Sequence, residues 1–306
     1  MGRRYIMNTV RYSSEALFEN FKNLEVRVEP EQKAVWLYFN SQPRSCYTLT
    51  LLKELDKFQS ILRHHDGKLS CNGTSINIEY CVITSRHPVF SFGGDLDYFI
   101  QCIENNDREL LTEYAKYCID AVYYSYIGRE FGITTISLIH GNALGGGFEA
   151  ALSSQVLIAE QSAEMGFPEV LFDLFPGMGA YNLLTQRVSP MMAEKIMLSG
   201  RLYSADELKD IGVIDTVVKD GEGIDAVNAF IHSNQHRLNS FKAIRKVRQI
   251  SDPIDYQELI EIGNIWVEMA LKISKKDLRT MTRLVKSQKR FSTNNNDVPI
   301  SRVTAS

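Results

Sequence analysis

Two glutamates, Glu149 and Glu169, lie twenty residues apart in segments marked by glycine and proline. The first closes residues 141–149, which contain the triplet Gly145-Gly146-Gly147, and the second directly follows Phe167-Pro168. Two carboxyl groups that face one site can remove and donate protons at neighbouring substrate atoms when their pKa values differ. The pair is therefore the first candidate for general acid and base catalysis.

Backbone amides beside the first glutamate offer a second kind of chemistry. The glycine triplet stands between a β-rich run, residues 133–139, and a helical pattern, residues 148–152. Glycines at such a junction allow close backbone approach, and a new helix directs free N–H groups at whatever lies there. No Lys-Ser or Lys-Thr pair follows and the spacing differs from GxGxxG, which disfavours a phosphate loop. Developing negative charge on a carbonyl oxygen is the better ligand for these amides.

An oxyanion hole needs a second donor, and the loop that ends in Phe92-Gly93-Gly94-Asp95-Leu96 offers one. A predicted strand again meets a predicted helix there. One such donor typically stabilises a transition state by about 3–4 kcal/mol. Asp95 is interpreted as the N-cap of the following helix rather than as a catalytic group.

The elements that must position these residues follow from hydrophobic periodicity. Residues 24–28 and 34–39 predict a hairpin, and the alternation of strands and helices that follows predicts parallel βα units, hence an α/β fold. We expect further strands at residues 76–84, 133–139, 156–159 and 213–218, and helices at 48–62, from 95, and at 107–126, 180–188, 191–198 and 204–211.

Three regions are expected along the chain. Residues 1–222 form the α/β core, with residues 1–20 as a loose N-terminal extension. Residues 223–290 contain no strand pattern and form a helical region, with helices at 225–232, 256–273 and 276–290. Residues 291–306 are polar, include three consecutive Asn residues, and are expected to be a disordered tail.

Composition excludes several classes of function. The chain has 306 residues, 44% hydrophobic, and a formal net charge of −3, which gives no reason to expect nucleic acid as a partner. No run of the ~20 apolar residues that a membrane span needs is present. Five scattered cysteines favour reduced thiols in the cytoplasm, and no metal or cofactor site is visible. The basic stretches at 242–248 and 272–290 are interpreted as solvated helix faces.

Taken together, these motifs resemble the crotonase, or enoyl-CoA hydratase/isomerase, superfamily. The resemblance rests on residues 141–149, on Phe167-Pro168-Glu169 with the later Pro176-Gly177-Met178-Gly179, and on Gly93-Gly94-Asp95-Leu96. It implies a spiral of ββα units with a C-terminal helical region that forms trimers or hexamers. It also implies oxyanion-hole amides at Gly94 and Gly146 and acid/base glutamates at 149 and 169. Retention of both glutamates implies hydration or dehydration.

Within that superfamily the chain is most similar to bacterial diffusible signal factor synthases, on Phe148 and on residues 167–181. This resemblance implies dehydration of a medium-chain 3-hydroxyacyl thioester on acyl carrier protein to the cis-2-enoyl form, then hydrolysis to the free acid. It also implies a sensor-kinase domain as a regulatory partner. Two assignments of roles within the pair are open. We prefer the one in which Glu169 removes the C2 proton and Glu149 interacts with the 3-hydroxyl, although the opposite assignment is nearly as well supported.

A conventional enoyl-CoA hydratase of fatty-acid degradation is the alternative, and Arg86 and His87 leave a grip on CoA phosphates open. A regulatory binding protein without catalysis is a third hypothesis, which the intact glutamates disfavour. The helix at 110–126 is expected to pack in the core or at an interface rather than to act as a lid. Candidates for an acyl-chain pocket, each equally compatible with core packing, are Phe148, Met165, Leu171, Phe172, Leu174 and Met178.

Overall fold

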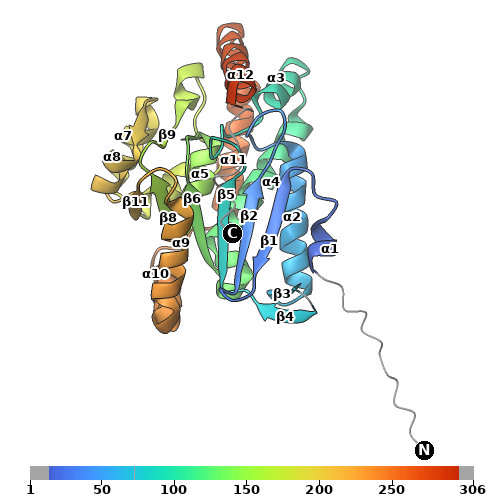
Figure 1. The fold of residues 1–306 in the computed structure, drawn as a ribbon. Helices are drawn as coiled ribbons and strands as arrows, with labels where there is room; N and C mark the ends of the chain where they lie inside the picture. The colour runs from blue at the N-terminus through green and yellow to red at the C-terminus, as the bar shows by residue number, and fades with distance from the viewer. Residues whose placement is uncertain (1–13, 72, 296–306) are drawn as a thin grey trace, which may run out of the picture.

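A twisted six-stranded sheet forms the centre of the molecule (Figure 1). The computed structural model describes residues 14–71 and 73–295. The first two strands pair antiparallel as a hairpin, and all other pairs in the sheet are parallel. In spatial order the strands are β1 (Leu24–Glu29), β2 (Ala34–Phe39), β5 (Tyr80–Ser85), β6 (Thr134–Ile139), β8 (Val156–Glu160) and β11 (Thr216–Val218).

Helices cover both faces of this sheet. One face, which includes Trp36, Tyr80 and Ile158, packs against α9 (Gly223–Asn234) through Val227 and Ile231. The other face packs against a larger set of helices that includes α2 (Leu49–His64) and α4 (Arg108–Tyr126). Thr48 and Asp107 cap these two helices by accepting from the amides of the third helical residues, Leu51 and Leu110.

A second, three-stranded sheet lies next to the carboxyl ends of the central strands. Its order is β10 (Leu202–Ser204), β9 (Glu164–Gly166) and β7 (Ala143–Leu144). The elements around it are short: α3 (Leu96–Glu104), α5 (Gly146–Leu152), the 3₁₀ turn η2 (Pro168–Phe172), α6 (Ala180–Thr185), α7 (Pro190–Ser199) and α8 (Ala205–Asp210). This sheet matters because β7 leads into the first glutamate and β9 into the second.

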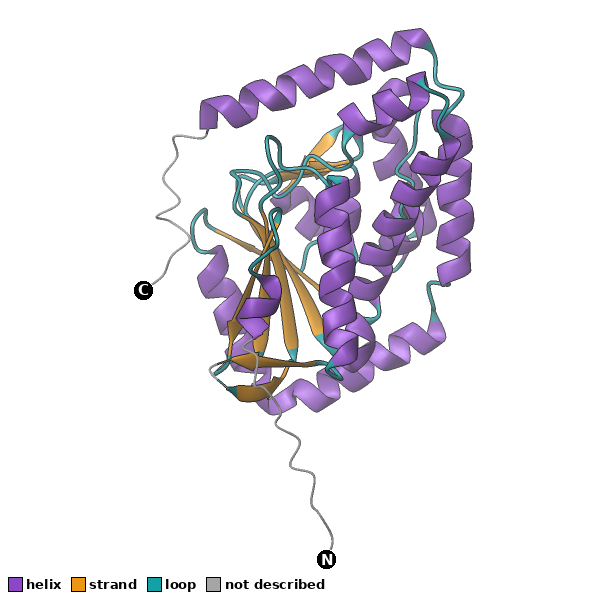
Figure 2. Ribbon diagram, turned by 90° about the vertical axis from the view of Figure 1, so that its right-hand side faces the viewer, coloured by secondary structure: helices purple, strands orange, loops and turns teal. Residues whose placement is uncertain are grey.

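The C-terminal region consists of helices alone after η3 (Gln235–Arg237): α10 (Leu238–Ser251), α11 (Tyr256–Ala270) and α12 (Lys275–Asn295). α11 packs along α4, whereas α12 contacts α3 and η2. Figures 1 and 2 place α12 along the upper edge of the molecule, beyond the carboxyl ends of the strands. Within the described ranges, no helix has both the length and the apolar character needed to cross a membrane.

Several sequence predictions of the fold are confirmed and three need correction. The hairpin, the α/β alternation and the C-terminal helices are present. The expected strand at residues 76–84 is two strands, because β4 (Thr74–Asn77) turns back onto β3 (Lys68–Cys71) before β5 begins. The basic stretch at 242–248 lies within α10. Both predicted loose ends are partly ordered.

At the N-terminus, α1 (Ser14–Phe18) packs onto the core, with the Phe18 ring 5.8 Å from that of Phe58, so residues 14–18 are not loose. At the C-terminus, residues 291–295 belong to α12 rather than to a disordered tail, because that helix continues through Asn295. The remainder of both predictions, residues 1–13 and 296–306, lies outside the described residues, as does residue 72.

Candidate active site

A single cavity of about 290 Å³ lies between the carboxyl ends of the central strands and the C-terminal helices. It brings together both glutamates and both glycine loops, although Gly94 and Glu169 are 75 positions apart in the sequence. The predicted site residues that line it are Gly94, Gly146, Glu149, Glu169, Leu171, Phe172, Leu174 and Met178.

The two glycine loops lie side by side because backbone hydrogen bonds join them. The Ser91 amide donates to the Asn142 carbonyl at 3.1 Å, and the Leu144 amide donates to the Ser91 carbonyl at 2.9 Å. A Cβ placed on Gly146 would lie 3.4 Å from the Gly94 nitrogen. Within the described chain no backbone hydrogen bond uses the amide of Gly94 or of Gly146. Two adjacent free donors in a cavity wall form the geometry of an oxyanion hole.

Glu149 lies in the first turn of α5, two residues after the glycine triplet, and is almost completely buried. Its Oε1 accepts hydrogen bonds from the amides of Met178, at 2.7 Å, and Ala180, at 3.0 Å. Burial raises the pKa of Glu149 to about 7, and the two amides oppose that rise because they stabilise the charged form. The carboxyl group is thus fixed in position and titrates near neutrality.

Glu169 reaches the same cavity through the small sheet. β9 pairs with β7, and the Gly145 amide donates to the Gly166 carbonyl at 2.8 Å, so the turn η2 begins beside the glycine triplet. A Cβ on Gly145 would collide with Glu169 Oε1, and the backbone there has a φ of +53°. Only glycine satisfies both conditions. The triplet therefore also makes room for the second carboxyl group.

The environment of Glu169 is less polar than that of Glu149. Its Oε2 is buried and has no hydrogen-bond partner within the described residues. Burial, and then the nearby charge of Glu149, raise the pKa of Glu169 to about 8. Since two like charges in one apolar cavity repel, the pair holds one proton between them near neutral pH. Such a pair contains a base and an acid at the same time.

Four of the six predicted acyl-pocket residues line the cavity: Leu171, Phe172, Leu174 and Met178. Phe148 and Met165 do not line it; both side chains are fully buried and pack in the main hydrophobic core. The Phe148 ring packs 5.1 Å from that of Phe167, which anchors α5 against the strand-to-turn junction. These two predictions are corrected to core residues.

Much of the remaining wall comes from helices that sequence reasoning did not assign to the site. α4 contributes Tyr114 and Cys118, so the helix predicted to serve only packing also bounds the cavity. α11 contributes Trp266, and α12 contributes Leu284 and Gln288. An apolar stripe at helical spacing looks the same whether it faces a core or a cavity. No sequence signal separated the two cases.

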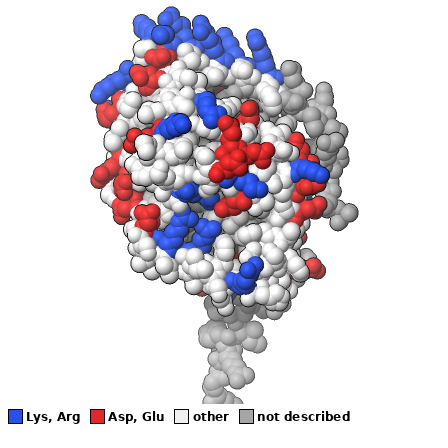
Figure 3. All heavy atoms as spheres, turned by 90° about the vertical axis from the view of Figure 1, so that its left-hand side faces the viewer, with Lys and Arg blue, Asp and Glu red and all other residues white. Residues whose placement is uncertain are grey.

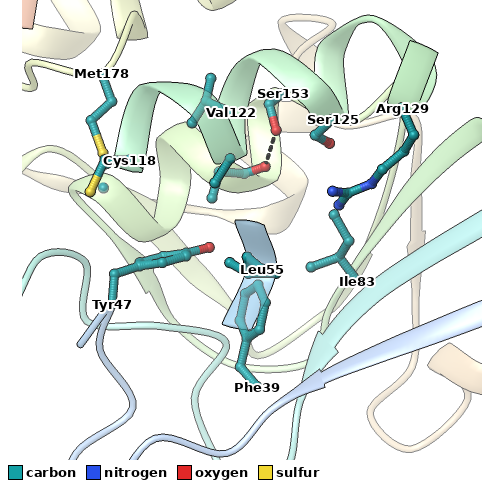
Figure 4. A pocket seen from close by; sticks show the side chains of 13 residues that line it. Phe39, Tyr47, Leu55, Ile83, Cys118, Val122, Ser125, Arg129, Ser153 and Met178 are labelled. Carbon is teal, nitrogen blue, oxygen red and sulfur yellow. Dashed lines mark hydrogen bonds between the residues drawn. The ribbon is translucent and has the colours of Figure 1, made fainter. Parts of the chain in front are cut away.

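A smaller cavity of about 20 Å³ lies behind the glycine triplet at residues 145–147 (Figure 4). It shares the lining residues Cys118, Gly146 and Met178 with the first cavity. Three polar atoms of its lining residues, Tyr47 Oη, Ser125 Oγ and Arg129 Nε, are buried without a hydrogen-bond partner in the described chain. This space matches a single water with polar neighbours, not an acyl chain.

Two residues of the loop between β5 and α3, residues 86–95, here called the oxyanion loop, have structural rather than catalytic surroundings. Asp95 stands at the N-cap of α3 as predicted, but its carboxylate accepts from Arg44 at 2.7 Å instead of capping the helix. Arg86 pairs with Glu25 at 2.7 Å and lies over the ring of Tyr38, so it does not line the cavity. Among the described residues no group of three or more His, Cys, Asp or Glu is arranged to hold a metal.

Comparison with known proteins agrees with this geometry. The profile of the enoyl-CoA hydratase/isomerase family matches residues 72–252, more than half of the chain. The chain belongs to this family. It is similar to a Bacillus subtilis protein named "Probable enoyl-CoA hydratase", with 29% identity over 147 residues, 48% of this chain and 55% of that protein. It thus spans about half the length of that curated relative.

A second curated relative is the fatty acid oxidation complex subunit alpha of Pseudomonas syringae pv. tomato. Its identity is 28% over 142 residues, 46% of this chain and 19% of that protein. Both matches are partial, so they support the family assignment more than any particular substrate.

Solved structures share the fold over a longer stretch. An enoyl-CoA hydratase from Bacillus halodurans matches with a TM-score of 0.71 and 17% identity, covering 86% of this chain and all of that one. Pseudomonas aeruginosa DspI matches with a TM-score of 0.63 and 22% identity, covering 88% and 98%. The α/β architecture with its C-terminal helices is therefore the crotonase fold.

Proposed function

We propose that this protein is a hydro-lyase that removes water from a medium-chain 3-hydroxyacyl thioester. The main observation in support of this proposal is that two carboxyl groups with raised pKa values and two free amides line the same apolar cavity. In this proposal the amides of Gly94 and Gly146 bind the thioester oxygen and stabilise the enolate that forms when the C2 proton leaves.

The proton balance follows from the shared proton of the pair. One glutamate is ionised and takes the C2 proton; the other is protonated and donates to the departing C3 hydroxyl, which leaves as water while the C2–C3 double bond forms. Because two amides stabilise its charge, Glu149 is the ionised member in the resting site, and Glu169 is the protonated one. This order is the reverse of the assignment preferred from the sequence.

The proposed product is the cis-2-enoyl chain released as a free acid, a fatty-acid signal. The resemblance of residues 167–181 to diffusible signal factor synthases supports this, and the apolar wall supports an acyl substrate. Thioester hydrolysis requires that water attack the carbonyl carbon. The same two amides would stabilise the tetrahedral oxyanion, and the thiol of the carrier would leave with a proton.

The second candidate function is a conventional enoyl-CoA hydratase, favoured by the partial match to the Bacillus subtilis relative. Incubation of the purified protein with 3-hydroxydodecanoyl carrier protein separates the two. Free cis-2-dodecenoic acid, detected by mass spectrometry with chromatographic separation of isomers, supports the synthase. A trans-2-enoyl thioester that remains attached to its carrier, together with rapid hydration of crotonyl-CoA, contradicts it.

A further inference from the structure

The last helix, α12, carries a concentration of positive charge that the proposed chemistry does not use. It has seven Lys and Arg residues and one Asp, whereas the whole chain has a net charge of −3. Arg279, Arg283 and Lys286 are exposed and form no ion pair within the described residues. Figure 3 shows basic side chains gathered along the upper edge of the molecule, where Figure 1 places α12.

The opposite face of the same helix belongs to the candidate active site. Met281 and Val285 are buried in the core, and Leu284 and Gln288 line the cavity. These positions follow helical spacing, so the basic residues on the same turns point away from the cavity wall. The charged face and the cavity therefore lie on two sides of one helix.

Three contacts hold α12 beside the oxyanion loop. Arg44 donates to Gln288 Oε1 at 2.7 Å, and Lys289 pairs with Asp97 at 2.8 Å. The ring of Phe291 meets that of Phe92 edge to face at 5.8 Å. Since Phe92 and Asp97 flank the Gly94 donor, the basic face has a defined position relative to the site of the proposed thioester.

We propose that the basic face of α12, formed by Lys276, Arg279, Arg283 and Lys286, is the docking surface for an acidic carrier protein that delivers the acyl thioester. Charge complementarity selects this occupant, because a face with this much positive charge attracts an acidic protein surface and steers its approach. The inference rests on the proposed function, since it names how the acyl chain arrives. A two-fold contact between copies through this face is disfavoured, because the two basic faces would then meet and repel each other.

The test compares substrates with and without the carrier. The double variant Arg283→Glu/Lys286→Glu is expected to lower kcat/KM for 3-hydroxydodecanoyl carrier protein at least about tenfold at low salt, with the difference shrinking as salt screens the surface. The same variant should turn over the N-acetylcysteamine thioester at the wild-type rate, because neither side chain lines the cavity. Lys209→Glu/Lys219→Glu, with the same charge change on exposed residues elsewhere, is the matched control and should behave as wild type.

Binding is measured separately, so that failure of the proposed function remains distinguishable. Fluorescence anisotropy of a labelled holo-carrier protein should report salt-dependent binding to the wild type and its loss in the double variant, whether or not any thioester is consumed. Equal binding by both proteins overturns the docking surface. The kcat/KM of both proteins is also measured with 3-hydroxydodecanoyl-CoA. A decrease in the double variant with this substrate, but not with the carrier-protein substrate, also overturns the proposal, because the basic face would then bind CoA phosphates.

Discussion

At the scale of single residues, the site depends on two carboxyl groups whose surroundings differ. Glu149 accepts two amide hydrogen bonds, whereas Glu169 has one oxygen without a partner in the described chain. The sequence predicted both residues because glycine and proline mark their segments. It could not order their pKa values, because the amides of Met178 and Ala180 come from a loop about thirty residues away.

The shared proton predicts a bell-shaped pH dependence. As pH rises toward about 7, activity increases because one carboxyl group must be ionised to act as base; above about 8, activity falls because the second group loses its proton. The measurement is kcat/KM against pH. Glu149→Gln and Glu169→Gln should each remove one member of the pair and lower kcat by a factor of about 10² or more. Near wild-type turnover by either variant contradicts the two-carboxylate scheme.

The distribution of roles has its own test. In deuterated water the base exchanges the C2 proton of a bound substrate analogue that lacks the hydroxyl. We expect Glu169→Gln to retain exchange and Glu149→Gln to lose it, because Glu149 is the resting base in our scheme. The opposite pattern restores the assignment preferred from the sequence.

The raised pKa of Glu169 also determines how the stability of the protein changes with pH. The pKa of Glu169 is higher in the folded chain than in the unfolded chain, so the folded state binds more protons and the free energy of unfolding decreases as pH rises from about 4.5 to about 8. Glu169→Gln removes this cost, and we expect it to stabilise the protein at pH 8 by about 1–3 kcal/mol but not at pH 4.5. Chemical denaturation at both pH values measures this, and an equal effect at the two contradicts it.

Gly145 provides a further test at this scale. Gly145→Ala would drive a methyl group into the Glu169 carboxylate and strain a backbone with a φ of +53°. Gly132→Ala is the control, because its φ is +64° and no atom lies within 4 Å of the added Cβ. Both should destabilise the fold by about 1–2 kcal/mol. Only Gly145→Ala should abolish dehydration by folded protein, and equal activity of the two variants would refute this role.

At the scale of elements, the small sheet β10-β9-β7 sets the relation between the two glutamates. Its strands have two or three residues, too few for a period-2 pattern to identify them in the sequence. The longer strands and helices were predictable because their apolar residues repeat over several turns or pleats. The helices that close the cavity were predictable as helices but not as cavity walls.

The role of α12 as a wall predicts an effect on chain-length selection. Leu284→Trp adds bulk to the cavity, whereas Leu278→Trp places the same bulk on this helix at a position that does not line it. We expect Leu284→Trp to lower kcat/KM for a dodecanoyl-length substrate relative to a hexanoyl-length one, because buried methylene groups lose their contacts. An unchanged ratio, or the same change in Leu278→Trp, contradicts the assignment.

At the scale of the whole molecule, α10 presents an apolar stripe without a cover. Ile244, Val247 and Ile250 are 69%, 61% and 70% exposed, and none of the α10 residues is buried. Large exposed apolar residues at helical spacing are typical of an interface. We propose that this stripe forms the contact between copies in a trimer or hexamer. The sequence predicted that the C-terminal helical region as a whole forms this contact, whereas the exposed stripe assigns it to α10.

Sedimentation tests the α10 contact. Val247→Glu should shift the protein from an oligomer to monomer, because a charge at the centre of an apolar contact loses its hydration. Lys246→Glu is the control: position 246 is next to Val247 but carries a charged side chain in the native protein, so this variant should remain an oligomer. Truncation near residue 223 is a poorer experiment, because it also removes Trp266 and Leu284 from the cavity wall. An oligomer that survives Val247→Glu would place the contact elsewhere.

The central claim is that one cavity dehydrates a 3-hydroxyacyl thioester through a proton-sharing glutamate pair. The most direct measurement is product analysis after incubation of 3-hydroxydodecanoyl carrier protein with the wild type, Glu149→Gln and Glu169→Gln. The account predicts free cis-2-dodecenoic acid from the wild type and none from either variant. Unchanged 3-hydroxydodecanoyl carrier protein after incubation with folded wild-type protein, or equal product from a glutamate variant, would contradict it.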